Sequence, residues 1–321
     1  MNDDELDRRA LRTLQRSIPA DRWNPLAQAI ADDRRGREAA IASPCSAGAL
    51  APLLPELQAN GFAKLPVGLP NAAEVRSFLE MHPVYRGPNS DNGGDAMSLE
   101  TARQSHQMAC YRPEVVLRAP GLIDRFNDPS LLALIEDYLG CVPTLYSLNS
   151  WWSFPAARPS MPNVQFFHRD NDDWRFVVVF TYLTDVDGES GPHQIVAGSH
   201  TVEGLRERAP SSWWKRSSYD VEKSFTAAFG VEFSDEIERV FADSIRSIEG
   251  PAGTMFLANT LALHRGLVPR KRPRLLIWAR YGLGANANSV DYHFAPVARW
   301  SVPTTIPDDA RHRYVNRLLF R

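Results

Sequence analysis

The second half of the chain consists of short strand-like runs that are not separated by alternating helices. Runs rich in Val, Ile, Phe, Trp and Tyr are bounded by clusters of Gly, Pro, Asn and Asp, which is typical of β-strands joined by turns. The expected strands are residues 144–152, 163–169, 175–185, 193–196, 254–264 and 274–281. Because parallel strands need long crossover connections, usually helical, this pattern predicts an antiparallel sandwich or jelly roll and not a Rossmann sheet.

Helical segments flank these strands and interrupt them once. Residues 1–60 predict an N-terminal helical extension, in which a helix over 23–41 follows the break at Pro19. A short strand is expected at 61–67, a helix at 71–81, and another helix from the N-cap pair Asp128-Pro129 to Gly140. Residues 201–247 indicate a charged insertion between two strands, with a helix over 234–247. Residues 61–321 are therefore expected to form one domain that carries this insertion.

Composition excludes several classes of protein. Hydrophobic residues make up 44% of the 321, which suits a globular core and argues against a disordered or fibrous chain. The 36 basic and 38 acidic side chains nearly cancel, so no nucleic-acid partner is expected. The acidic first residues differ from a secretory signal, and no apolar run approaches the roughly 18 residues of a spanning helix, so we expect no membrane partner and a cytoplasmic location. Cys45, Cys110 and Cys141 form no disulfide pattern and are expected to be buried thiols.

The tripeptide His168-Arg169-Asp170 is the first candidate for chemistry. In a strand, positions i and i+2 point to the same face about 6–7 Å apart, so an imidazole and a carboxylate can close on one small ion. A second, distant histidine would complete a two-histidine, one-carboxylate face that suits a divalent metal and leaves coordination positions open. Taken alone, the tripeptide is also compatible with a solvated strand edge.

The tripeptide belongs to an ordered series of motifs. The series is Gln165-Phe166-Phe167-His168-Arg169-Asp170, Asp185-Val186-Asp187-Gly188-Glu189-Ser190-Gly191-Pro192, Ala197-Gly198-Ser199-His200, Gly253-Thr254-Met255-Phe256-Leu257 with His264, and Pro273-Arg274. In this order the motifs resemble those of the phytanoyl-CoA dioxygenase (PhyH-like) family of Fe(II)- and 2-oxoglutarate-dependent oxygenases. The resemblance covers roughly residues 144–281 and implies a mainly β fold, with a double-stranded β-helix core (a cupin-like jelly roll) and flanking helices.

The resemblance also implies roles for individual residues. His168, Asp170 and His264 would be the iron ligands, and Arg274 would bind the distal carboxylate of 2-oxoglutarate, with Arg280 on the same strand face as the reserve. Dioxygen would be the other co-substrate, and an unactivated C–H bond of a small-molecule metabolite would be hydroxylated with release of succinate and CO2. Related halogenases have a small residue at the carboxylate position, so Asp170 favours oxygenation.

Three further residues are candidates for the same site. Phe180 aligns with an aromatic residue that borders 2-oxoglutarate, Asn149 could donate a hydrogen bond to it, and Trp174 falls where some relatives place an aromatic residue against the substrate. Each also has an ordinary structural interpretation, as a core residue, a cross-strand hydrogen bond or a rim residue. Two positions depart from the family, because Gly266 stands where a hydroxyl residue often helps to hold the co-substrate and His193 replaces an apolar residue.

Alternative functions stay open at this point. The same site could desaturate, epoxidise or cyclise a substrate, since hydrogen abstraction is common to these reactions. A non-catalytic jelly-roll binding or scaffold protein and a cupin-type metal hydrolase or isomerase belong to other classes, and the latter would not need Arg274. The insertion carries Arg206, Arg208 and Arg216, which would suit an anionic substrate as well as a solvated helix, and its segment 213–216 would suit a lid or a partner surface.

Overall fold

Two antiparallel sheets form the centre of the molecule in the computed structural model, which describes residues 14–15, 17–18, 20–42, 46–86, 95–156, 162–170, 172–209, 231–283 and 296–321. The large sheet has the strand order β1-β7-β4-β9-β3-β2 and the small sheet the order β6-β5-β8. The strands are β1 (Phe62–Lys64), β2 (Met108–Cys110), β3 (Thr144–Ser153), β4 (Phe176–Tyr182), β5 (His193–Val196), β6 (Ile245–Ile248), β7 (Met255–Ala258), β8 (His264–Gly266) and β9 (Arg274–Gly282). The predicted jelly roll, a mainly β fold with flanking helices, is confirmed.

The two faces of the large sheet bury different clusters. Along β9, Leu275, Ile277 and Ala279 pack into the core beneath the flanking helices, whereas Leu276 and Trp278 pack into the core between the sheets. The inner cluster joins both sheets, since it also contains Phe180 and Phe256 from the large sheet and Ile195 and Ile248 from the small one. By the same alternation Arg274 and Arg280 belong to the inner face, so cations from β9 enter the space between the sheets.

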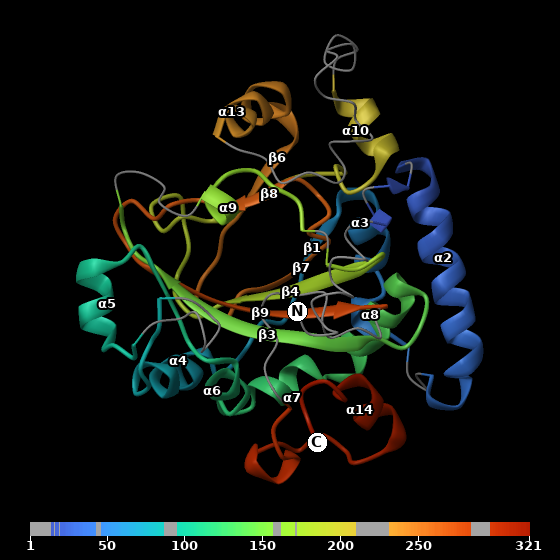
Figure 1. Cartoon of the computed structure of the whole chain (residues 1–321), viewed down its shortest axis with the longest axis horizontal. Helices are drawn as coiled ribbons and strands as arrows, with labels where there is room; N and C mark the ends of the chain where they lie inside the picture. Colours follow the sequence, from blue (N-terminus) through green and yellow to red (C-terminus); the bar gives the residue numbers. More distant parts are fainter. Residues whose placement is uncertain are drawn as a thin grey trace.

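Helices cover the outer face of the large sheet, as Figure 1 shows below and beside it. They are α2 (Ala20–Arg37), α3 (Leu53–Asn60), α4 (Ala72–Glu80), α5 (Leu99–Ser105), α6 (Pro113–Leu117), α7 (Leu122–Phe126), α8 (Pro129–Leu139) and α14 (Ala310–Val315). The predicted caps of α8 are confirmed, because the Asp128 carboxylate accepts from Leu131 N at 3.0 Å and Gly140 ends the helix with φ 83°. Among the described residues, every helix is too short or too polar to span a lipid bilayer. Cys110 and Cys141 are buried and free, whereas Cys45 lies outside the described residues.

Two strand predictions were wrong in detail. Residues 163–169 are not a strand, because Pro162 opens the short helix α9 (Pro162–Gln165) and only His168 then pairs with a strand residue. The predicted strand 254–264 is two strands, β7 and β8, separated by a turn. The turn forms because the Asn259 side chain accepts a hydrogen bond from Leu261 N at 3.0 Å and breaks the extended run.

Two helices of the insertion, α10 (Val202–Arg208) and α13 (Val231–Val240), pack against the outer side of the small sheet, where they contribute to a third hydrophobic cluster (Figure 1). The prediction of one helix over 234–247 was wrong at its end. Residues 245–248 form β6, which pairs with β5 along its whole length. Its middle residues Arg246 and Ser247 are exposed, so the strand has a polar sequence that resembles the preceding helix. Arg216 and the predicted lid or partner segment 213–216 lie outside the described residues.

Candidate metal centre

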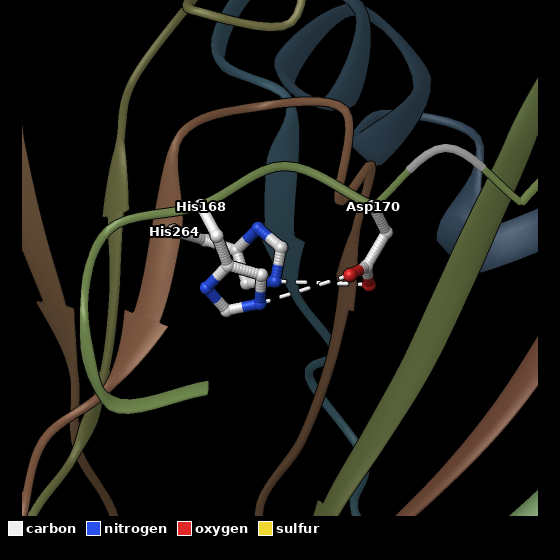
Figure 2. A group of neighbouring side chains, drawn as sticks. All are labelled: His168, Asp170 and His264. Carbon is white, nitrogen blue, oxygen red and sulfur yellow. Dashed lines mark ion pairs between the residues drawn. The ribbon is translucent and has the colours of Figure 1, made fainter. Parts of the chain in front are cut away.

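His168, Asp170 and His264 meet between the two sheets (Figure 2). One ligand atom of each lies within 4.8 Å of the other two. The Nε2 atoms of His168 and His264 are each 3.7 Å from a different oxygen of the Asp170 carboxylate. Three donors on one side of a common point suit a divalent ion and leave its opposite side open.

Backbone pairing holds the three ligands in place. His168 and His264 form an isolated antiparallel bridge with reciprocal N–H to O bonds of 2.9 and 3.0 Å, and their ring centroids are 4.2 Å apart. Asp170 N–H donates to Thr260 O at 2.9 Å, which ties the carboxylate to the turn before β8. The structure brings His168 and Asp170 close together through this bridge and turn, and not through the continuous strand that was predicted.

Hydrogen bonds to the far side of each imidazole determine which nitrogen can bind a metal. Nδ1 of His168 lies 2.8 Å from Phe166 O, and Nδ1 of His264 lies 2.9 Å from Ala262 O. Because a carbonyl oxygen only accepts, each Nδ1 carries the proton and each Nε2 keeps its lone pair. The hydrogen bonds to Phe166 O and Ala262 O therefore direct both lone pairs toward the common point. Metal-binding histidines are commonly oriented in this way, by a hydrogen bond from the ring nitrogen that does not bind the metal.

The electrostatics keep Asp170 and His264 in the protonation states that bind a metal. Burial by itself would raise the pKa of Asp170, but the facing His264, Arg280 and His168 outweigh it and lower that pKa to about 2. Burial lowers the pKa of His264 to about 3, and the neighbouring His168 acts in the same direction. Near neutral pH the carboxylate is thus ionised and the His264 imidazole is neutral, which is the donor set that Fe(II) and similar ions bind.

Arg274 and Arg280 differ in what they face. Arg280 is ion-paired with Asp172 at 2.9 Å and lies 3.5 Å from Asp170, so its charge is matched by carboxylates. Arg274 is only 3% exposed, and its guanidinium donates to Gly191 O and to Ser153 Oγ. Within the described part of the chain it faces no carboxylate, and burial lowers its pKa. A buried cation with neutral partners is prepared for an anionic ligand, and this favours Arg274 over Arg280 as the carboxylate-binding residue.

The remaining predicted residues divide into two groups. Phe180 and Asn149 both lie opposite Trp278 on the inner face of the large sheet, with Phe180 on one side of β9 and Asn149 on the other. Asn149 donates to Ser147 Oγ. Trp174 instead packs on Trp23 of α2, with ring centroids 5.0 Å apart, and its predicted contact with a substrate stays a prediction.

The structure adds His193 to the site. Its ring centroid is 5.4 Å from that of His264 and 4.8 Å from that of Phe180. Burial, with the neighbouring His264 and Arg274, holds the pKa of His193 well below its ordinary value, so the imidazole is neutral near pH 7. In the sequence the only signal was a histidine in place of an apolar residue after the Gly191-Pro192 turn.

The comparisons with known proteins find distant structural similarity only. No protein-family model matches the chain, and no curated protein sequence matches it. Among solved structures, the epimerase SnoN in complex with Fe3+, alpha ketoglutarate and nogalamycin RO is 18% identical over 73% of this chain and 84% of its own, with a TM-score of 0.46. EctD from S. alaskensis with 2-oxoglutarate and 5-hydroxyectoine is 16% identical over 76% of this chain and 78% of its own, with a TM-score of 0.47. HygX from Streptomyces hygroscopicus with nickel and 2-oxoglutarate is 17% identical over 72% of this chain and 86% of its own, with a TM-score of 0.43.

Proposed function

We propose that the chain is an Fe(II)- and 2-oxoglutarate-dependent oxygenase that acts on a small molecule. One observation carries the proposal. A two-histidine, one-carboxylate triad and a buried arginine without a carboxylate partner in the described part of the chain belong to the same space between the sheets of a jelly roll. A metal hydrolase needs the triad alone. An enzyme that binds 2-oxoglutarate, which chelates the metal at one end and carries a distal carboxylate at the other, also needs the cation.

Each residue has a defined task in this proposal. His168, Asp170 and His264 hold Fe(II) through two Nε2 atoms and a carboxylate, and Arg274 binds the distal carboxylate of 2-oxoglutarate. Phe180 and Asn149 border the co-substrate from the large sheet. When bound, the iron and 2-oxoglutarate would together activate dioxygen for the oxidation of a C–H bond. The protein contributes a buried, largely apolar enclosure that excludes water from that chemistry.

We propose hydroxylation, with release of succinate and CO2, as the outcome, and a PhyH-like family as the origin of the motifs. Trp174 is proposed as a substrate contact, and Arg206 and Arg208 of α10 are proposed to favour an anionic substrate. We propose no nucleic-acid or membrane partner. Residues 61–321 form the proposed catalytic domain behind the extension 1–60, in a cytoplasmic protein. The neighbours include an epimerase, SnoN, and a carbocyclase, SnoK. The alternative is therefore that hydrogen abstraction from the substrate leads to desaturation, epoxidation or cyclisation and not to hydroxylation. A product heavier by one oxygen supports hydroxylation, and a product lighter by two hydrogens supports desaturation.

The test is succinate formation from 2-oxoglutarate with added Fe(II) and dioxygen, first without substrate and then with candidate metabolites. Asp170→Ala and His264→Ala should abolish succinate formation and Fe(II) binding. The control His106→Ala changes the histidine that caps the C-terminus of α5, outside the site, and should leave both unchanged. If the unaltered chain neither binds Fe(II) nor forms succinate, the proposal is wrong and a scaffold function is favoured. If Arg274→Ala forms succinate as fast as the unaltered chain, Arg274 does not hold the co-substrate. Metal binding without any succinate formation would favour a cupin-type hydrolase or isomerase over the oxygenase.

A further inference from the structure

His193 is a buried histidine with an unused nitrogen beside the metal centre. It is the first residue of β5 and is 4% exposed. Its Nε2 atom has no hydrogen-bond partner among the described residues. The ring lies nearly parallel to that of His264, at 17°, and also contacts Phe180 and Phe256. Aromatic neighbours therefore fix the plane of the ring, and the nitrogen edge is left for a ligand.

The residue paired with His193 across the small sheet is Gly266, so two departures from the family pattern are direct neighbours. Side chains of directly opposed residues lie on the same face of a sheet, and the missing side chain at 266 leaves room there for the Arg274 guanidinium. A Cβ atom at position 266 would come within 2.8 Å of Arg274 Nη2. The space that a side chain at 266 would enter is thus bordered by the guanidinium of Arg274 and by the strand that carries His193.

The surrounding contacts hold this arrangement. Arg274 donates to Gly191 O, two residues before His193, and His193 N–H donates to Tyr182 Oη at 3.1 Å. Tyr182 Oη in turn donates to Ile248 O at 2.8 Å. These bonds tie the Arg274 guanidinium to the turn before β5 and fix the backbone at His193. A buried polar nitrogen without a partner is costly, and such groups in folded proteins commonly have a ligand or water as the missing partner.

Arg274 and the His193 imidazole both need an acceptor, and one ligand carboxylate can serve both. Arg274 has no carboxylate partner among the described residues, and the imidazole nitrogen of His193 has no partner there. We propose that His193 donates a hydrogen bond from Nε2 to the distal carboxylate of 2-oxoglutarate, next to the guanidinium of Arg274. This inference rests on the proposed function. His193 would then make the hydrogen bond to the co-substrate that a hydroxyl residue often makes at position 266, where this chain has glycine. The pocket would be selective for 2-oxo acids that carry a second carboxylate.

Two substitutions separate the hydrogen bond from the ring. His193→Phe keeps the stacking on His264 and Phe180 and removes the donor, whereas His193→Gln keeps an N–H donor and removes the ring. The matched control is His82→Leu, which changes a half-buried histidine at the end of α4 on the outer side of the large sheet. Dissociation constants are measured by calorimetry on the full chain loaded with Fe(II) without oxygen. The ligands are 2-oxoglutarate and 2-oxopentanoate, which has the same chelating end and no distal carboxylate.

His193→Phe should weaken 2-oxoglutarate binding by about tenfold or more, as expected for one hydrogen bond to a charged acceptor, and leave 2-oxopentanoate and Fe(II) affinity unchanged. His193→Gln should retain most of the 2-oxoglutarate affinity, and His82→Leu all of it. Equal weakening of both ligands by His193→Phe, or no weakening of either, would overturn the assignment while the oxygenase proposal stands. If the unaltered chain does not bind 2-oxoglutarate, the proposed function and the assignment both fail.

Discussion

Adding one methyl group at Gly266 should weaken the co-substrate while sparing the metal. The Cβ of Gly266→Ala would lie 2.8 Å from Arg274 Nη2, whereas ordinary contacts begin at 3.4 Å, so the guanidinium has to retreat. It cannot rotate freely, because the buried guanidinium also donates to Gly191 O and Ser153 Oγ. The backbone φ of Gly266 is not in the left-handed region, so alanine can adopt this backbone conformation without strain.

The expected loss of 2-oxoglutarate affinity follows from the bidentate geometry in which a guanidinium binds a carboxylate. Displacing Nη2 removes one of the two charge-assisted hydrogen bonds that a bidentate arginine makes. One such bond contributes about 1.5–3 kcal/mol, which corresponds to about a 10- to 150-fold rise in the Kd for 2-oxoglutarate. The three atoms nearest to this methyl position all belong to Arg274 and none to His168, Asp170 or His264, so Fe(II) affinity should stay the same.

The assay is 2-oxoglutarate titration of the Fe(II)-loaded chain without oxygen, with Fe(II) affinity measured by competition with a chelator. The control is Gly36→Ala near the end of α2, where an added Cβ meets nothing within 4 Å. The control should leave 2-oxoglutarate affinity unchanged and raise the free energy of unfolding by about 0.5–1 kcal/mol. A folded Gly266→Ala protein with unaltered 2-oxoglutarate affinity would mean that the Arg274 guanidinium, at this position, does not hold the co-substrate.

Two further predictions concern stability. Arg280→Met leaves the buried Asp172 and the half-buried Asp170 without their shared cation, so it should lower the free energy of unfolding of the metal-free protein in urea by about 3–5 kcal/mol. A divalent metal should restore part of this loss, and an unchanged unfolding midpoint would contradict the pairing. His200 bonds to Gln58 O on α3, and burial lowers its pKa to about 4. Between pH 6.5 and 4 the His200 imidazole therefore binds a proton in the unfolded chain but not in the folded one. The free energy of unfolding consequently falls by about 3 kcal/mol as pH decreases over this range. His200→Gln should remove that part of the slope, and identical slopes for both proteins would show that His200 is not the group responsible.

Local chemistry was enough to predict much of the fold. The caps of α8, the limits of β5 and the turn-rich strand pattern follow from neighbouring residues, and the structure confirms them. The failures have a common cause in long-range pairing. The polar segment 245–248 becomes a strand only because β5 offers it a free edge, and residues 163–169 lose their strand because His168 alone finds a partner in His264. Pairing across that distance has no local signal in the chain.

The same distinction applies to the site. The residue types of His168, Asp170, His264 and Arg274 could be selected from motif order, but their convergence depends on a bridge between two strands and a turn at Thr260. Arg274 and Arg280 share a strand face and could not be separated by alternation. Only the surrounding carboxylates separate them, since Asp172 lies far from Arg280 in sequence and beside it in space.

His193 and Gly266 show why departures from a pattern must be considered in pairs. Taken singly, a histidine in an apolar position predicts a buried polar group, and a glycine in a hydroxyl position predicts a lost contact. The register of β5 with β8 places the two residues opposite each other, with Arg274 beside the glycine. The histidine and the glycine then become one feature, because glycine leaves room for the Arg274 guanidinium and the ring nitrogen can supply the donor that glycine cannot. The selectivity of the pocket is consequently a property of the strand pairing, and no single position along the chain contains it.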